Sequence, residues 1–368
     1  MLLFKGLRDQ ILAPLQSVCG IVEKRHTLPI LSNVLIEKSG ERLTLLATDI
    51  EVQIKTSTHA APGGDNIMLT VAARKLQDIL RSLPEAAEVS LSLESKRLQI
   101  KAGKSRFNLQ TLPAEDFPRM AQGDVGKTQL SLSQKQFKRL LALVQYAMAQ
   151  QDIRYYLNGL LLVVKGNGIH VVATDGHRLA YASETLGEQQ QPIEVILPRK
   201  TVLELSRQLA DNDDPLQISL TPTQALFSFG AIEFVSKLVD GKFPDYERVI
   251  PQGHNKVVRM SRTILLQSLL RAKILTNEKT PGVRLVFADG SLKILSNNSE
   301  REEAQEEIEI IYKDEPIDVG FNVNYLLDLL NNVSNEEIDC RLADANSSAL
   351  FHLPGNESFK YVVMPMRI

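Results

Sequence analysis

The stretch LTLLATDIEVQI (43–54) recurs in related form as IHVVATDGHRLAYA (169–182) and again as LKILSNNSEREEA (292–304). Each copy is a run of alternating apolar residues, typical of a half-buried strand, followed by a polar turn. The Thr or Ser at the start of each turn gives spacings of 126 and 122 residues. This period is too long for a solenoid repeat, so the sequence predicts three homologous domains of about 120 residues.

Two other patterns recur with the same period. Each third contains a segment with helical spacing: VAARKLQDIL (71–80), LPRKTVLELS (197–206) and FNVNYLLDLL (321–330). Each third also has a proline near its end, in DFPRM (116–120), KFPDY (242–246) and VMPMR (363–367). Polar segments with glycine at 122–129 and 251–256 are suitable linkers. We therefore expect domains at 1–122, 123–254 and 255–368.

Within each third, a helix precedes strands and the pattern then occurs a second time, so the predicted fold class is α+β. The predicted helices are 7–20, 73–83, 133–149, 199–210, 261–276 and 322–333. In the middle third, the predicted strands are 160–165, 169–174, 216–220, 225–229 and 232–237. The chain thus carries six units of a helix followed by strands.

Composition indicates a globular protein with a sizeable core, because 43% of the 368 residues are hydrophobic. No apolar run approaches the length needed to span a bilayer and the N-terminus does not resemble a signal peptide, so we expect a cytoplasmic protein without a membrane partner. Cys19 and Cys340 are far apart and the six histidines are scattered. We expect both cysteines in the core, with no disulfide, metal site or cofactor.

The net charge of −2 conceals a segregation of charge. The six predicted helices carry 13 Lys and Arg against 4 Asp and Glu, whereas the remainder carries 29 against 40. If the helices share one surface, that surface could follow a phosphate backbone without reading bases. The alternative is that Lys and Arg simply favour solvated helix faces. The sixth helix departs from the trend, since its one charged residue is Asp328.

The segment ATDGHRLA (173–180) places Thr174, Asp175, His177 and Arg178 together, which suggests a small-molecule enzyme as an alternative function. A hydrolase or nucleotide-binding motif does not accompany it. The first copy repeats Thr-Asp without His, so we interpret these residues as turn chemistry at the end of a strand. A sequence-specific DNA regulator is a third hypothesis, but nothing in the chain resembles a helix-turn-helix.

Several blocks, in order along the whole chain, resemble the bacterial replicative polymerase sliding clamp, the DNA polymerase III beta subunit. These blocks are TLPIL (27–31), QQDIRYYLNG (150–159), ATDGHRLA (173–180), KLVDGKFPDYERV (237–249), LTNEK (275–279), GFNVNY (320–325) and YVVMPMRI (361–368). The resemblance implies three clamp domains, each with two helices packed on antiparallel sheets. It further implies a head-to-tail homodimer that closes as a six-domain ring, with helices lining the hole.

A clamp of this family encircles duplex DNA without sequence preference and tethers the replicative polymerase, so the resemblance implies a non-catalytic processivity factor. The implied partners are DNA, the polymerase, the clamp loader, and other polymerases and repair proteins that bind through short peptides. The implied peptide groove comprises Leu157, Thr174, Gly176, His177, Arg178, Leu179, Pro244, Arg248, Val249, Asn322, Tyr325, Ser348, Val362, Val363, Met364, Pro365, Met366 and Arg367. The alternative for the C-terminal segment is an ordinary last strand.

The resemblance also implies contacts to DNA and between subunits. The candidate DNA-binding residues are Arg25, Gln151, Arg154, Tyr155, Tyr156 and Lys200. The candidate dimer residues are Phe107, Ile274 and Leu275. The tyrosines and the apolar residues could equally pack within a domain, and a head-to-tail contact must close to avoid fibres.

Overall fold

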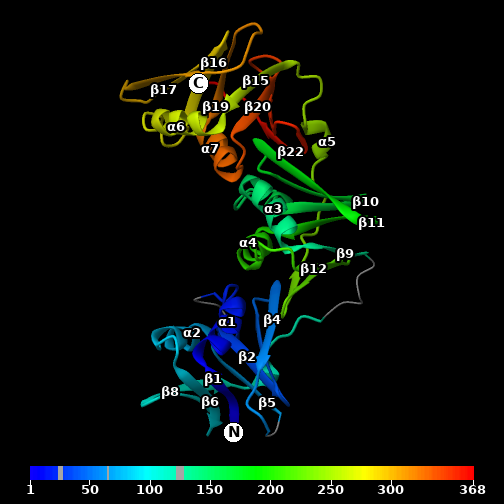
Figure 1. Ribbon diagram of the computed structural model, residues 1–368, viewed down its shortest axis with the longest axis vertical. Coiled ribbons are helices and arrows are strands. Elements are labelled where there is room, and N and C mark those ends of the chain that lie inside the picture. Colours follow the sequence, from blue (N-terminus) through cyan, green and yellow to red (C-terminus); the bar gives the residue numbers. More distant parts are fainter. Residues whose placement is uncertain (24–27, 64–65, 122–127) are drawn as a thin grey trace. The chain divides into compact units, whose positions relative to one another are not determined.

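The computed structural model describes residues 1–23, 28–63, 66–121 and 128–368 (Figure 1). Its contacts group the chain into two units. The first unit comprises Met1–Phe137 with Leu203–Leu238, and the second comprises Lys138–Val202 with Val239–Ile368. The division falls inside helices α3 (Gln134–Val144) and α4 (Arg199–Gln208). The boundary expected at 122 falls outside the described residues, and the one at 254 stays a prediction.

The first unit is built on one twelve-stranded antiparallel sheet. The order of its strands is β1-β6-β7-β8-β5-β2-β3-β4-β14-β13-β12-β9. The bounds are β1 (Leu2–Leu7), β2 (Asn33–Ser39), β3 (Arg42–Thr48), β4 (Val52–His59), β5 (Ile67–Ala72), β6 (Glu88–Glu94), β7 (Arg97–Ala102), β8 (Ser105–Leu112), β9 (Thr128–Ser133), β12 (Pro215–Leu220), β13 (Gln224–Phe229) and β14 (Ile232–Lys237).

Helices α1 (Arg8–Cys19) and α2 (Ala73–Ser82) pack against each other and against strands of this sheet (Figure 1). In α2, Ala73, Leu76, Gln77 and Leu80 are buried, which is the spacing of one helix face. Strand β3 is buried almost throughout, because it is central in the sheet and contacts α1.

The second unit contains two antiparallel sheets. The six-stranded sheet has the order β10-β11-β22-β21-β20-β15, and the four-stranded sheet has the order β18-β17-β16-β19. The bounds are β10 (Gly159–Thr174), β11 (Arg178–Pro198), β15 (Lys256–Ser261), β16 (Gly282–Ala288), β17 (Ser291–Asn297), β18 (Glu303–Glu309), β19 (Ile317–Asn322), β20 (Glu337–Leu342), β21 (Ala349–Leu353) and β22 (Asn356–Val363).

Helices α6 (Arg262–Lys273) and α7 (Val323–Asn332) pack together beside these sheets. Helix α6 contacts β15, β17 and β18, and α7 contacts β19. The side chains of Ser261 and Asn322 accept hydrogen bonds from backbone N–H groups in the first turns of α6 and α7. These N-caps explain why the two helices begin where they do.

All six predicted helices are confirmed to within a few residues, and they carry the same 13 basic and 4 acidic side chains. The prediction of two separate strands at 160–165 and 169–174 is wrong, because β10 is continuous from 159 to 174. Register shifts at Gly166 and Gly168 absorb the irregularity, so the glycines mark a bulge in the pairing with β11 and not a turn. A short helix, α5 (Tyr246–Val249), was not predicted.

Both cysteines are buried free thiols, as predicted. Burial raises the pKa of Cys19 to about 12, so this thiol stays protonated near neutral pH. Among the described residues, no three His, Cys, Asp or Glu side chains are grouped to hold a metal ion. Within the same residues, none of the helices has both the length and the apolar character to cross a membrane.

Candidate functional site

A tight turn connects β10 to β11 in the second unit. The Thr174 hydroxyl donates to the carbonyl of Arg178 (2.6 Å) and accepts from the N–H of Gly176 (3.0 Å). One carboxylate oxygen of Asp175 accepts from the N–H groups of His177 (2.9 Å) and Arg178 (3.1 Å). These bonds confirm that Thr-Asp is turn chemistry, because both side chains are used to close the backbone.

The Arg178 guanidinium joins this turn to helix α7 and to the segment that follows α3. It donates to the carboxylates of Asp175 (3.1 Å) and Asp328 of α7 (2.6 Å) and to the carbonyl of Tyr146 (2.6 Å). Its carbon also lies 4.4 Å from the centre of the Tyr325 ring. Only 9% of the Arg178 side chain is exposed. Arg178 therefore holds the turn against α7, and Asp328 supplies its negative counter-charge.

The protonation states around Arg178 are fixed by burial and charge. Burial opposes the charge of Arg178, but the interactions with Tyr361 and Asp328 together raise its pKa above the usual range. Burial raises the pKa of Tyr146 and Tyr361, because it disfavours the charged phenolate, so both phenols stay neutral. The Tyr361 hydroxyl donates to the carbonyl of Tyr325 (3.0 Å), which attaches β22 to α7.

An apolar cluster contains three of the predicted groove residues. Leu157, Leu179 and Val362 belong to it and are at most 2% exposed. The cluster comprises Ala149, Leu157, Leu161, Val163, Val172, Leu179, Ile196, Phe243, Ile250, Leu350 and Val362. It is assembled because β11 pairs with both β10 and β22, which places alternate side chains of three strands on one face.

The C-terminal segment after β22 is held by two backbone hydrogen bonds. The N–H of Met364 donates to the carbonyl of His177, and the N–H of Met366 donates to the carbonyl of Gly320, both at 2.9 Å. A side chain at Gly320 would meet the Met366 carbonyl oxygen at 2.5 Å, so the close approach of the two backbones requires glycine. The tail is thus anchored at two points, while 48% of Met364 is exposed.

The other predicted groove residues differ in their exposure and contacts. Phe243 and Ile250 pack in the apolar cluster, which holds α5 and its neighbour Pro244 over it. Val249 is 47% exposed, and the side chain of Arg248 is 87% exposed and pairs with Asp245 (2.9 Å). Among the remaining candidates, Val363 is buried beside Arg178, Pro365 is half-buried, Arg367 is exposed, Asn322 caps α7, and the Ser348 carbonyl accepts from His254.

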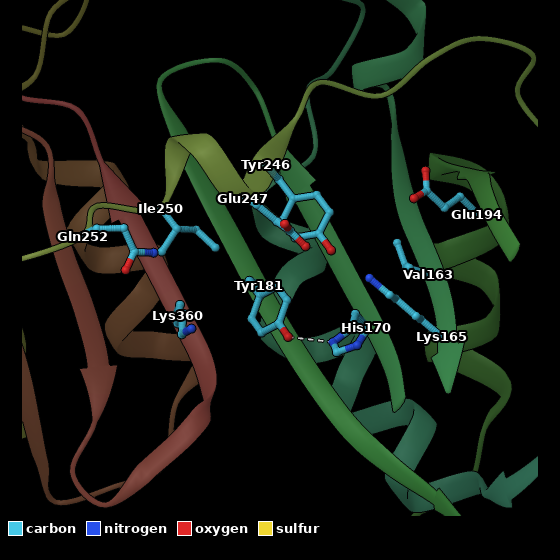
Figure 2. A pocket seen from close by; sticks show the side chains of 10 residues that line it. All are labelled: Val163, Lys165, His170, Tyr181, Glu194, Tyr246, Glu247, Ile250, Gln252 and Lys360. Carbon is cyan, nitrogen blue, oxygen red and sulfur yellow. Dashed lines mark hydrogen bonds between the residues drawn. The ribbon is translucent and has the colours of Figure 1, made fainter. Parts of the chain in front are cut away.

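A cavity of about 390 Å³ is lined by residues of β10, β11, β22 and segment 246–252 (Figure 2). Figure 2 shows Tyr181 and Tyr246 near its centre and the Tyr181 hydroxyl bonded to Nδ1 of His170 (2.6 Å). Its lining residues are Val163, Lys165, His170, Tyr181, Glu194, Tyr246, Glu247, Ile250, Gln252 and Lys360. None of these residues except Val163 and Ile250 belongs to the apolar cluster.

The structure separates the candidate DNA residues. Arg154 lies against the 174–178 turn: it pairs with Asp152 (2.8 Å) and donates to the carbonyl of Asp175 (3.1 Å). Tyr155 is 58% exposed, whereas Tyr156 packs on the apolar cluster. Gln151 is exposed, with a positive φ of 55°, and Lys200 is in the first turn of α4. Arg25 lies outside the described residues.

The candidate dimer residues are surface residues of their units. Phe107 is half-buried on β8, Ile274 is 75% exposed at the end of α6, and Leu275 is half-buried beside it. Sequence reasoning missed Tyr146 and Tyr361 as partners of Arg178, because their positions depend on tertiary contacts with no local pattern. For Asp328 the sequence did offer a signal. It is the one charged residue of the predicted helix 322–333, whereas the other predicted helices together carry mostly Lys and Arg.

Comparison with known proteins accounts for this architecture. Models of the DNA polymerase III beta subunit match along almost the whole chain: the N-terminal domain at residues 2–121, the central domain at 131–245 and the C-terminal domain at 247–367. The class of protein is therefore a clamp of three related α+β domains. The chain belongs to the DNA polymerase III beta subunit family, whose members are named beta sliding clamps.

Individual relatives agree over the full length. The beta sliding clamp of Pseudomonas putida is 47% identical over 362 residues, and that of Escherichia coli K12 is 42% identical over 361 residues, with 98% of each chain covered in both cases. The crystal structure of the DNA polymerase III subunit beta from Pseudomonas aeruginosa matches with a TM-score of 0.96 and 46% identity over 100% of both chains. A clamp from the same organism bound to griselimycin matches equally well.

Proposed function

We propose that this member of the sliding clamp family closes as a head-to-tail dimer around duplex DNA and tethers the replicative polymerase there. The observation that supports this most strongly is the family match over all three segments, combined with six helices that hold 13 basic and 4 acidic side chains. Positive charge suits a surface that faces phosphates, and acidic strands discourage DNA from binding elsewhere. Because a ring is linked topologically, each contact can stay weak enough for sliding.

The proposed domains are 1–122, 123–254 and 255–368, and the three family segments, at 2–121, 131–245 and 247–367, support a division into three domains. Two copies would supply six domains to the ring. Phe107, Ile274 and Leu275 are proposed as subunit contacts because each retains exposed surface. The chain is proposed to act without catalysis: Thr174 and Asp175 close a turn, and Arg178 is held by two carboxylates. It would act in the bacterial cytoplasm, where a replication clamp works.

The predicted groove is proposed to bind short peptides from the polymerase, the clamp loader and repair proteins. The groove residues combine members of a buried apolar cluster with exposed apolar residues such as Met364 and Val249, and such a surface accepts apolar side chains from varied partners. Each apolar anchor would contribute about 1.5–3 kcal/mol before ordering costs, so exchange between partners is expected. The contact of Arg154 with the Asp175 carbonyl supports a role for Arg154 in this groove. Gln151, Arg154, Tyr155, Tyr156, Lys200 and Arg25 remain the proposed DNA contacts.

A loader-dependent assay on nicked circular DNA tests both parts of this proposal. The full chain should be retained on circles and released when the DNA is linearised, because only an encircling protein depends on closed ends. A chain lacking residues 364–368 should stay folded but lose both loading and polymerase stimulation, because the loader and the polymerase are proposed to bind the same groove. Retention on linear DNA would contradict encirclement, whereas normal processivity of the truncated chain would contradict the groove assignment alone.

A further inference from the structure

A second cavity, of about 210 Å³, lies over strands β20, β21 and β22. Segment 250–254 crosses between it and the larger cavity, and Ile250, Gln252 and Lys360 line both (Figure 2). The other lining residues are Pro251, Gly253, His254, Arg341, Leu350, His352 and Glu357. Apart from Ser348, which accepts from His254 through its carbonyl, no residue assigned to the peptide groove is involved.

Strand pairing directs basic side chains into this cavity. Arg341 of β20 is opposite Leu350 of β21, and Leu350 is opposite Val362 of β22. Since side chains alternate along a strand, Arg341, His352 and Lys360 share one face of the sheet. Segment 250–254 adds His254 from above. The cavity therefore gathers an Arg, a Lys and two His from three different parts of the chain.

The acidic side chains near this cavity are either paired with a residue outside it or exposed, and the exposed ones include Asp344 near His254. Asp339, opposite His352, is 4% exposed, and its two oxygens accept from Arg259 at 2.7 and 2.9 Å. Glu357 is 4.0 Å from Arg341, and its side chain is 84% exposed, so it screens that charge weakly. The cavity consequently keeps an excess of positive charge.

Two buried nitrogen atoms at the cavity have no hydrogen-bond partner among the described residues. They are Nε of Arg341 and Nε2 of His352, and His352 is only 9% exposed. Leaving such a group unsatisfied costs about 1–3 kcal/mol, so buried polar atoms normally have a partner. The unpaired N–H at Nε of Arg341 indicates a missing acceptor, and Nε2 of His352 becomes a further donor when its ring is protonated.

We propose that this cavity binds a small oxyanion, either phosphate or carboxylate, between Arg341, His352 and Lys360. Guanidinium groups bind such oxygens through short, charge-assisted hydrogen bonds. The volume suffices for one ion of this size with a few waters, since a water takes about 30 Å³ of liquid. None of these three side chains is a predicted groove or DNA residue, and the proposal does not depend on the function proposed above.

The proposal includes a dependence on pH. Burial and the neighbouring charge of Arg341 lower the pKa of His352, so the empty site holds a neutral imidazole near pH 7. The other charged or titratable groups that face it are Asp339, Glu357, Lys360 and His254, with Asp339 already paired. A bound anion favours protonated His352, so binding takes up a proton. Affinity should rise as pH falls from the pKa of His352 in the bound state toward its lowered pKa in the empty site.

The test uses the full chain with ¹³C-labelled histidines, titrated with inorganic phosphate and separately with acetate at constant ionic strength. The His352 resonance, assigned with His352→Gln, should shift and saturate. Arg341→Gln should weaken binding by about tenfold or more, because a charge-assisted hydrogen bond is lost. Lys256→Gln is the matched control, since it removes one positive charge from β15 on the face opposite Arg341. It should change affinity less than about twofold.

A third variant keeps the test decisive if Arg341→Gln unfolds. Glu357→Gln removes an exposed competing carboxylate and should tighten binding by about two- to fivefold. A response to phosphate alone identifies phosphate as the ligand, and a response to both salts identifies oxyanions in general. The proposal is overturned if His352 does not respond to either salt, or if Arg341→Gln and Lys256→Gln weaken binding equally. Partner-peptide binding, measured in parallel, should be unchanged in all three variants.

Discussion

The turn at residues 48–52 in the first unit and the turn at 174–178 in the second have the same hydrogen bonds but different side chains. Thr48 donates to the carbonyl of Val52 and accepts from the N–H two residues on, as Thr174 does with Arg178. In both turns the following Asp accepts two backbone N–H groups. The repeated Thr-Asp pair therefore encodes the shape of the turn.

The difference between the copies lies at the last three positions. The first turn has Ile50, Glu51 and Val52, where the second has Gly176, His177 and Arg178. Val52 is buried, and Glu51 forms an ion pair with Lys237. In the second turn, Arg178 bonds to Asp328 of α7, and the His177 carbonyl accepts a hydrogen bond from the N–H of Met364. Duplication kept the backbone, and the proposed site arose from the side chains placed on it.

The largest expected effect comes from giving the second turn the residue of the first. Arg178→Val leaves the carboxylate of Asp175 and the Tyr146 carbonyl without their buried partner, and such a loss costs about 3 kcal/mol. Denaturant unfolding of the full chain measures it. Arg284→Val is the control, because Arg284 is 54% exposed in its pair with Asp318 and should cost less than about 1 kcal/mol. Equal losses of unfolding free energy in the two variants would mean that Arg178 does not hold the turn against α7.

The third position of each turn provides a reciprocal exchange. Ile50 and Gly176 have φ angles of 79° and 89°, in the region that disfavours a β-branched residue. Gly176→Ile should cost about 2 kcal/mol, and Ile50→Gly should gain up to about 1 kcal/mol from relief of strain. Unfolding curves of the two variants check the opposite signs.

Of the two substitutions, only Gly176→Ile should change peptide binding in the groove. A Cβ at Gly176 would lie 2.9 Å from Nη1 of Arg154, so the Ile side chain displaces that guanidinium from the Asp175 carbonyl. Peptide affinity should therefore fall with Gly176→Ile and stay constant with Ile50→Gly. A loss of stability in both variants would show that the backbone of the two turns is not equivalent.

Replacing each threonine by valine tests whether the two turns are closed with equal strength. Thr48→Val and Thr174→Val each remove one donor and one acceptor with little change in volume, at a cost of about 1 kcal/mol. The two losses should agree within about 0.5 kcal/mol. A clearly larger loss for Thr174→Val would mean that this hydroxyl also supports the surrounding site.

The sequence predicted local features of this comparison well and long-range features poorly. Six helices, the Thr-Asp turns and the buried cysteines follow from spacing and residue type, which act over a few neighbours. The partners of Arg178 do not, because Tyr146, Asp328 and Tyr361 come together only through tertiary packing. In the third repeat, Ser296 aligns with Thr48 and Thr174 but does not close the turn. Its hydroxyl donates to the carbonyl of Ala272 in α6, and the side chain of Asn298 accepts from the backbone N–H groups of the turn.

The candidate site was predictable in the same uneven way. The resemblance selected residues of which three share one apolar cluster, but only coordinates distinguish the buried Leu157 from the exposed Met364. Periodicity also could not reveal that β14 of the middle segment pairs with β4 of the first. Pairing between strands that are far apart in sequence depends on register, which single-strand patterns do not specify.

The smallest expected effect concerns the ion pair beside the second turn. Hydrogen bonds from Arg154 lower the pKa of Asp152 from 3.8 to about 2. A carboxyl with a lowered pKa adds stability above its unfolded pKa and loses that contribution as pH falls through the folded value. Carboxyl NMR of the full chain should give a pKa near 2 for Asp152, which should rise toward 3.8 in Arg154→Gln. An unchanged Asp152 titration in this variant would mean that Arg154 does not hold the loop against the turn, and its assignment to the groove would lose its structural support.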